Sequence, residues 1–179
     1  FDDLAGSLER METIIDDLET LAKSGKSVES TEFLSLGDAV ETAARHLQTG
    51  DATITIEPDG QIRADRGRLL SILENLVRNS VDHVGPTVSI TVGVTEDGFF
   101  FEDDGPGIDA DLSRLFEYGY TTSSEGSGLG LSIVRTMAES HGWSVRVDPD
   151  HDGARFVVGG AGMDNEGQAG LARGLNVDA

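Results

Sequence analysis

The first 26 residues carry apolar side chains at alternating steps of four and three, with charged residues between them. This spacing predicts one amphipathic helix with a narrow apolar seam. A single helix cannot bury such a seam by itself, so we expect a partner helix or a second copy of the chain to cover it. The seam consists of Leu4, Leu8, Met11, Ile15, Leu18 and Ala22.

Helix and strand patterns alternate through the middle of the chain. Residues 27–35 are mostly polar and are predicted to be a linker, and residues 36–47 place their apolar side chains on one helical face. Residues 52–57 alternate as a strand does. From Asp65, a residue suited to capping, a broad apolar stripe predicts a long helix that Gly85-Pro86 ends.

Short strands predominate in the second half. A stretch rich in Gly, Ser and Thr, residues 104–128, precedes a predicted helix at residues 129–140. Residues 159–179 are glycine-rich and lack periodicity, so we expect a disordered tail. The predicted strands are residues 87–94, 98–103, 143–147 and 154–158.

Length and composition limit the possible functions. The 179 residues suffice for one domain with an appended element, and the lack of cysteine excludes disulfides and thiolate chemistry. A net charge of -20 repels nucleic-acid phosphates and anionic membranes, so we expect no nucleic-acid partner.

The apolar runs are too short to cross a bilayer, which predicts a soluble segment. The sequence starts at Phe1 without an initiator Met, so we expect a longer parent protein.

Two asparagines in the predicted long helix are the first candidates for a functional site. Asn75 and Asn79 lie four residues apart, so both amides project from one face of the helix. Amide oxygens are hard ligands that suit Mg²⁺, which takes its remaining ligands from phosphates and water. An Asn pair that caps a neighbouring loop fits this segment equally well.

Two glycine-rich segments add to this pattern. Asp103, at a strand end before Gly105 and Gly107, can accept a hydrogen bond from an exocyclic amine such as that of adenine, although an acidic turn is the alternative. The segment 126–131, Gly-Ser-Gly-Leu-Gly-Leu, opens a helix whose N–H groups favour anions. It matches neither the dinucleotide fingerprint nor a P-loop, and a flexible hinge is its alternative.

Together with Leu115-Phe116, these segments occur in an order that resembles the ATP-binding catalytic domain of sensor histidine kinases, within the wider gyrase, Hsp90 and MutL family. The resemblance covers residues 36–158 and is closest in style to halophilic archaeal kinases. It implies an α/β two-layer sandwich, with a mixed sheet of about five strands covered by three helices. Residues 1–26 are similar to the second helix of the dimerisation and phosphoacceptor hairpin that precedes this domain.

The resemblance also implies roles for particular residues. ATP and Mg²⁺ are the expected cofactors, with Asn79 as the metal ligand, Asn75 beside the phosphates and Asp103 contacting adenine. Residues 113–127 correspond to the ATP lid, anchored by Phe116. The expected nucleotide-binding set is completed by Asp82, His83, Gly105, Gly107, Ile108, Thr121, Thr122, Gly126, Ser127, Gly128, Leu129 and Gly130.

The implied activity is transfer of the γ-phosphoryl group of Mg-ATP to a histidine in two-component signalling. The expected partners are the protein's own upstream His-bearing helix, a response regulator receiver domain and a second copy of the chain bound through residues 1–26. The segment is expected to be the cytoplasmic portion of a protein whose membrane anchoring the sequence leaves open. His46, His83, His141 and His151 all lack the sequence context of a phosphoacceptor.

Two departures from the family pattern keep other functions open. Asp82 stands where many relatives carry Lys or Arg, and no basic residue lies between Phe116 and Gly126. A non-catalytic nucleotide-binding or dimerisation module is therefore one alternative. A gyrase- or Hsp90-type ATP hydrolase is another, but its base would stand at Asn75, and Glu74 lies about 140° round the helix from Asn79.

The acidic composition generates a prediction about salt. Only Lys23 and Lys26 are lysines among 13 basic residues, against 33 acidic ones, a balance typical of proteins from high-salt cytoplasm. Because molar salt shortens the Debye length to about 3 Å, we expect thermal melts to show a melting temperature that rises steadily with KCl. A melting temperature that stays flat from low to molar KCl would indicate an ordinary acidic protein instead.

Overall fold

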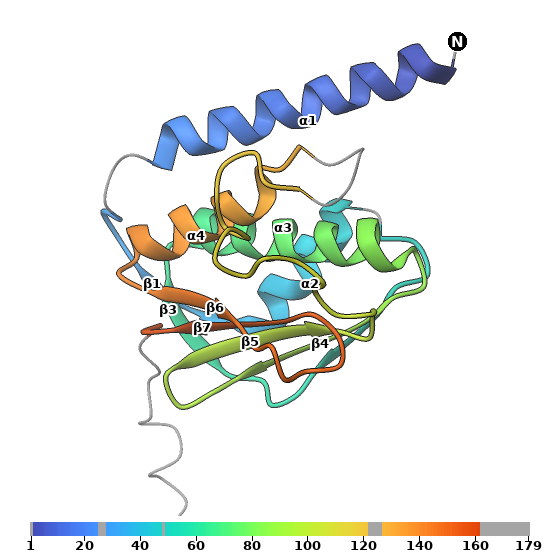
Figure 1. The fold of residues 1–179 in the computed structure, drawn as a ribbon. Helices are drawn as coiled ribbons and strands as arrows, with labels where there is room; N and C mark the ends of the chain where they lie inside the picture. Colours follow the sequence, from blue (N-terminus) through green and yellow to red (C-terminus); the bar gives the residue numbers. More distant parts are fainter. Residues whose placement is uncertain (1, 25–27, 48, 122–126, 162–179) are drawn as a thin grey trace, which may run out of the picture.

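The computed structural model describes residues 2–24, 28–47, 49–121 and 127–161, and a mixed sheet is its base (Figure 1). Along the chain the strands of this sheet are β2 (Thr53–Ile56), β4 (Ser89–Val94), β5 (Gly98–Asp103), β6 (Ser144–Val147) and β7 (Arg155–Gly159). In space their order is β2-β4-β5-β7-β6, with β2 parallel to β4 and the other neighbours antiparallel. The expected mixed sheet of five strands is confirmed.

Three helices cover one face of this sheet: α2 (Leu36–Leu47), α3 (Arg66–Val84) and α4 (Gly130–Ser140). The central helix, α3, contacts both of the others. Its apolar stripe is buried in the same core as Phe99 and Phe101 of β5. This arrangement confirms the α/β two-layer sandwich. The buried stripe consists of Leu69, Ile72, Leu73, Leu76 and Val77.

The ends of α3 follow the sequence prediction. The Asp65 side chain accepts a hydrogen bond of 3.0 Å from the Arg68 N–H, which caps the helix. Gly85 ends it with a φ of 120°, a conformation that favours glycine. These two signals fix the length of α3 and therefore the position of its polar face.

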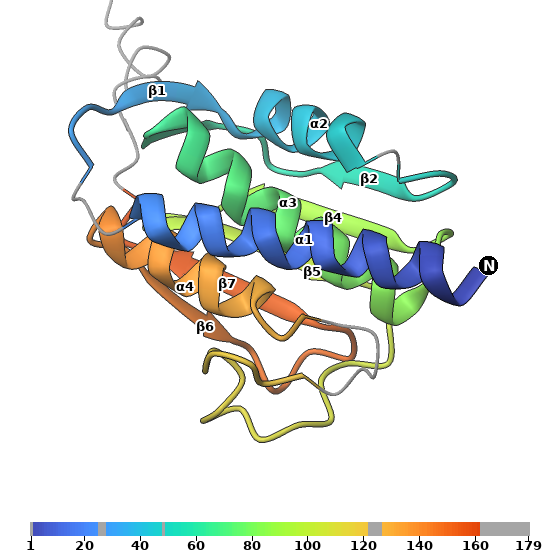
Figure 2. The ribbon, with the colours of Figure 1, turned by 90° about the horizontal axis from the view of Figure 1, so that it is seen from above.

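A fourth helix, α1 (Asp2–Ser24), lies across the helical layer on the side away from the sheet (Figures 1 and 2). Its contacts are chiefly with α4. The predicted seam faces solvent at Leu8, Met11, Ile15 and Leu18, whose side chains are 53–61% exposed. The helix therefore rests on the domain through another face and leaves these four seam positions uncovered in the single chain.

A second, two-stranded sheet was not expected from the sequence. It pairs β1 (Glu32–Ser35) with β3 (Gln61–Ala64) in antiparallel register, from Glu32 opposite Ala64 to Ser35 opposite Gln61. β1 lies in the segment predicted to be a linker, residues 27–35, and the sequence pattern predicts no strand at β3. Strands of four residues are too short to establish a period, and these two gain their hydrogen bonds from segments far apart in the chain.

The predicted C-terminal boundary is also shifted. The tail was expected to start at residue 159, but β7 includes Gly159, and the N–H groups of Gly160 and Ala161 both donate to the carbonyl oxygen of Asp97, at 2.8 and 3.0 Å. Ala161 is buried. The rest of the predicted tail lies outside the described residues.

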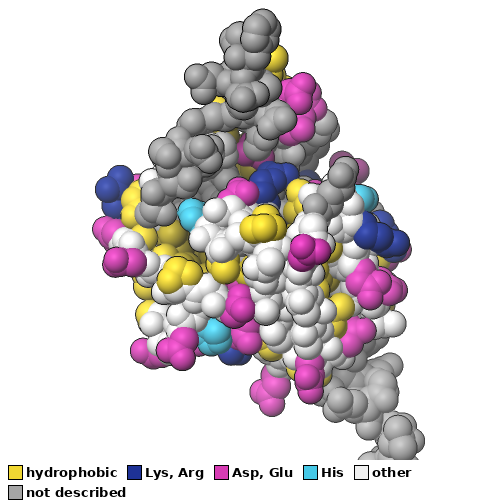
Figure 3. Space-filling model, turned by 90° about the vertical axis from the view of Figure 1, so that its right-hand side faces the viewer, with side chains coloured by type: hydrophobic (Ala, Val, Ile, Leu, Met, Phe, Trp, Pro, Cys, Tyr) yellow, Lys and Arg dark blue, Asp and Glu magenta, His cyan; other side chains and the backbone are white. Residues whose placement is uncertain are grey.

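Acidic side chains are numerous on the face of the molecule shown in Figure 3. On the face shown in Figure 3 they are scattered among polar and apolar atoms and do not gather in one patch. Among the described residues, no helix is both long enough and apolar enough to span a membrane.

Candidate nucleotide-binding site

The asparagine face of α3 meets the first residue of α4. A methyl group built on Gly130 would lie 3.2 Å from Oδ1 of Asn75 and 3.4 Å from Oδ1 of Asn79. The first distance is tighter than ordinary van der Waals contact and the second is at its limit, so a side chain at position 130 would require the Asn75 amide to shift by a few tenths of an ångström. The structure thus brings together two of the three segments that the sequence analysis singled out.

The two amides differ in their surroundings. Asn75 is 6% exposed, and its Nδ2 donates to the Ser71 carbonyl oxygen at 2.8 Å. Its Oδ1 is buried and has no hydrogen-bond partner among the described residues. Asn79 is only partly buried. A buried acceptor without a partner is costly, and such atoms often belong to ligand sites.

The N-terminus of α4 has the features of an anion site. Leu129 precedes the helix and provides no side-chain cap, and the positive end of the helix dipole lies here. Gly128 has a φ of 70°, and a methyl group there would lie 2.7 Å from the Gly119 carbonyl carbon. The preceding chain is held in place because the Leu129 N–H donates to Ser127 Oγ at 3.2 Å.

Asp103, at the end of β5, is 6% exposed and accepts three hydrogen bonds. The donors are Ser80 Oγ on α3 at 2.7 Å, the Gly105 N–H at 3.0 Å and the Ala154 N–H at 3.2 Å. An ionised carboxylate offers about four lone-pair positions. One acceptor position is therefore left for a ligand donor. Ser80 was missed by the sequence analysis, because a single serine within a helix produces no pattern.

The glycines beside Asp103 are required by packing within the protein. A methyl group on Gly105 would lie 2.4 Å from Cγ2 of Val84, and one on Gly153 would lie 1.8 Å from the Asp103 carbonyl oxygen. Gly107 has a φ of 79°, and its added methyl would lie 2.9 Å from the Asp152 carbonyl oxygen. These glycines let the loop after β5 lie against the turn at residues 152–153.

The remaining predicted residues lie at various distances from this centre. Asp82 and His83 are exposed near the C-terminal end of α3, and Thr121 is exposed in the loop after β5. Ile108 and Phe116 are partly buried and pack against the core, Phe116 beside the buried Leu115. Thr122 and Gly126 lie outside the described residues, as does most of the second half of the predicted lid.

The arginines near the site are engaged by acidic groups. Arg114 forms an ion pair with Glu117 at 3.2 Å and stacks over the Tyr120 ring. Arg78, between the two asparagines in sequence, lies 3.7 Å from Oδ1 of Asp17 on α1.

The Asp17 carboxylate was not recognised from the sequence. Its Oδ2 accepts a 3.0 Å hydrogen bond from Ser127 Oγ, and the residue is 4% exposed. Burial raises the pKa of this carboxyl, although the Ser127 hydroxyl and Arg78 act in the opposite direction. The sequence gives no sign of its burial, because Asp17 is one of several acidic residues between the seam positions.

Glu74 points to the other side of α3. Its Oε1 lies 2.7 Å from Nδ1 of His46 on α2, while Asn79 faces Gly130 on α4. A carboxylate held against α2 is badly placed to activate water at a metal on the Asn79 face. This geometry counts against a hydrolase that uses Glu74 as its base.

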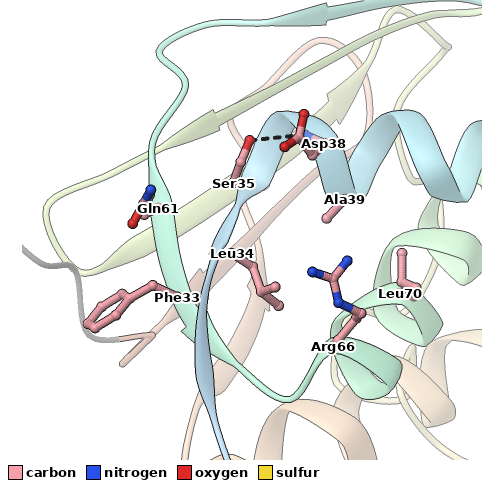
Figure 4. A pocket seen from close by; sticks show the side chains of 8 residues that line it. All are labelled: Phe33, Leu34, Ser35, Asp38, Ala39, Gln61, Arg66 and Leu70. Carbon is pink, nitrogen blue, oxygen red and sulfur yellow. Dashed lines mark hydrogen bonds between the residues drawn. The ribbon is translucent and has the colours of Figure 1, made fainter.

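A cavity of about 280 Å³ lies apart from this site, beside β1, β3 and the first turns of α2 and α3 (Figure 4). Arg66 and Asp38 contribute its charged groups, and Leu34, Ala39 and Leu70 its apolar wall. Arg66 is paired with Glu32 at 3.3 Å. The residues lining this cavity include none of those expected to bind nucleotide.

Comparison with known proteins places the nucleotide-binding geometry in a family. Residues 64–160, which include α3, the loop after β5 and α4, match the family described as histidine kinase-, DNA gyrase B-, and HSP90-like ATPase. The chain belongs to this family. Within this ATPase family its curated relatives include many sensor histidine kinases, which confirms the resemblance to the histidine kinase ATP-binding domain.

Two such relatives show how far the similarity extends. Sensor histidine kinase ZraS of Escherichia coli O157:H7 is 38% identical over 104 residues, which are 55% of this chain and 23% of that protein. Methanogenesis regulatory histidine kinase FilI of Methanothrix harundinacea (strain 6Ac) is 32% identical over 164 residues, 83% of this chain and 18% of that protein. The chain therefore spans about a fifth of the length of these ATPase-family relatives.

Solved structures of this ATPase family share the fold. The Acinetobacter baumannii histidine kinase AdeS aligns with a TM-score of 0.70 at 20% identity, covering 92% of this chain and 84% of that one. An alignment of this extent includes α1 as well as the sandwich. At this identity the likeness establishes the fold alone.

Proposed function

We propose that this chain is the ATP-binding catalytic domain of a sensor histidine kinase. Its activity would be transfer of the γ-phosphoryl group of Mg-ATP to a histidine of a dimerisation domain in two-component signalling. The observation that carries this proposal is that Asn75 and Asn79 of α3 lie against Gly130, the first residue of α4. In the same part of α3, Ser80 donates a hydrogen bond to Asp103. The sequence similarity to sensor histidine kinases supports it.

The residues at the asparagine face fit a magnesium–phosphate group. Asn79 is proposed as the metal ligand and Asn75 as its neighbour, because their amide oxygens are hard donors and that of Asn75 has no other described partner. Mg²⁺ would neutralise charge on the phosphates. The first N–H groups of α4 would bind phosphate oxygens directly.

At the other end of the site, Asp103 is proposed to accept a hydrogen bond from the adenine amine. Its remaining acceptor position supports this role, since three of about four positions are already taken. Guanine presents a carbonyl oxygen where adenine presents the amine, and a carboxylate would repel it. The site should therefore prefer ATP over GTP.

The partners of this domain follow from its exposed helix and its histidines. The solvent-facing seam of α1 supports a homodimer and packing against an upstream His-bearing helix, with a response regulator receiver domain as the later acceptor of the phosphoryl group. We place the domain in the cytoplasmic portion of a longer protein.

The described contacts of three histidines are structural: His46 binds Glu74, His141 stacks on Trp143 at 4.1 Å, and His151 lies 3.2 Å from Glu102.

The adenine assignment predicts the effect of removing the Asp103 carboxylate. Asp103→Ala should weaken Mg-ATP binding about 10- to 100-fold, because an unpaired amine in a desolvated slot costs about 1–3 kcal/mol. The preference for ATP over GTP should disappear with it. Calorimetry measures both affinities, and circular dichroism checks that the variant is folded.

Asp104→Ala is the matched control, because it removes an adjacent carboxylate that is exposed and bonded to the Ser89 N–H. Its ATP affinity should equal that of the wild type. Equal ATP affinity for the wild type and Asp103→Ala would show that Asp103 does not contact adenine.

The kinase assignment predicts that the chain cannot phosphorylate itself. With radiolabelled ATP, the isolated chain should bind nucleotide but remain unlabelled. Acid-labile label should appear when the upstream His-bearing helix is restored in the same chain or supplied in trans. A helix whose phosphoacceptor histidine is replaced by alanine is the control. Label mapped to one of the chain's own four histidines would contradict this prediction, and steady phosphate release without any acceptor would favour a hydrolase.

A further inference from the structure

One acidic side chain of α1 reaches the phosphate end of the nucleotide site. Asp17 is 4% exposed, whereas its neighbour Asp16 is exposed. The two carboxylate oxygens of Asp17 face different elements: Oδ1 lies 3.7 Å from Nη1 of Arg78 on α3, and Oδ2 accepts the 3.0 Å hydrogen bond from Ser127 Oγ. The carboxylate therefore bridges α3 and the chain that enters α4.

Both partners of Asp17 adjoin the groups proposed to bind phosphate. Ser127 accepts a hydrogen bond from the Leu129 N–H, one residue before Gly130. A methyl group added at Gly130 would lie against the Asn75 and Asn79 amides. Arg78 follows Asn75 on α3 and immediately precedes Asn79, and its side chain is 36% exposed. The Arg78 guanidinium and the Ser127 hydroxyl are hydrogen-bond donors of the kind that bind phosphate oxygens.

Carboxylates and phosphates compete for such donors. Each is an anion that accepts charge-assisted hydrogen bonds from arginine, and two anions cannot share one set of donors without repulsion. The family pattern provides a basic residue in the lid, which this chain lacks between Phe116 and Gly126. Arg78 would therefore stabilise a bound triphosphate, but its guanidinium is already paired with Asp17.

We propose that Asp17 is an internal anion that occupies the donors at the phosphate end of the site while α1 is docked, so that docking of α1 and binding of the triphosphate oppose each other. This inference rests on the proposed function. Release of α1 frees Arg78 and Ser127 for the phosphates, and a bound triphosphate in turn weakens the docking of α1 by the same factor. The helix that carries the dimerisation seam thereby regulates nucleotide binding.

The contact between α1 and the rest of the domain is of a kind that can form and break. Four seam residues of α1, Leu8, Met11, Ile15 and Leu18, contribute little to docking, because their side chains are more than half exposed to solvent. Leu21 packs against the core, and burial of the Asp17 carboxylate is unfavourable enough to raise its pKa. A contact that buries a charge at a cost is readily exchanged for another.

The test compares nucleotide affinities of the 179-residue wild type, Asp17→Asn and Asp16→Asn at one salt concentration by calorimetry. Asp17→Asn keeps the side-chain shape but removes the anion, so it should bind Mg-ATP about tenfold more tightly, the scale of losing the charged acceptor of the Ser127 hydrogen bond and the ion-pair partner of Arg78. Asp16→Asn removes the same charge from the exposed neighbouring position and should bind as the wild type does. Adenosine, which lacks phosphates, should bind all three equally and reports that the site is folded.

Three results would overturn the inference. They are an unchanged Mg-ATP affinity in Asp17→Asn, a weaker one, or an equal gain in Asp16→Asn, which would indicate a general charge effect. In each case the proposed function stands, because Mg-ATP still binds. Failure of every variant to bind Mg-ATP would instead contradict the proposed function and the competition together.

Discussion

The carboxylate of Asp103 joins three parts of the chain that are far apart in sequence. Ser80 on α3, Gly105 after β5 and Ala154 before β7 all donate to it. Removing this acceptor would leave those donors unpaired, at about 1–3 kcal/mol each where they are buried. The same residue thus fixes the helical layer against the sheet and presents one acceptor to the proposed adenine. Packing at this end of the site thus depends on the same side chain that is proposed to contact adenine.

Close packing at Gly130 shapes the other end of the site, where the phosphates are proposed to bind. Gly130 leaves little room for a side chain beside Asn75 and Asn79, so α4 begins close against the polar face of α3. Helix N–H groups, which favour anions, therefore lie beside amide oxygens, which favour a cation. An anion site next to a cation site suits a complex of Mg²⁺ with phosphate better than it suits the metal or the phosphate alone. The α1 helix, resting above, adds a competing carboxylate through Asp17.

Much of this arrangement could be predicted from local pattern. The cap at Asp65, the apolar stripe and the stop at Gly85 agree with one another, so α3 and its asparagine face were predictable. The pairing of β1 with β3 was not, because strands of four residues carry no readable period and their bonds are formed between distant segments. Ser80 and Asp17 gain their roles only from tertiary packing, which distinguishes them from other serines and acids of the same helices.

The most direct test of this account measures how much Mg²⁺ strengthens ATP binding in the wild type and in Asn79→Ala. Calorimetric titrations with ATP, each carried out in Mg²⁺ and again in a chelator, give that gain for both proteins. If Asn79 holds the metal beside the phosphates, Mg²⁺ will strengthen binding to the wild type but add little in Asn79→Ala, while the metal-free affinities stay similar. Equal losses of affinity with and without the metal would contradict the metal–phosphate site on which the account is built.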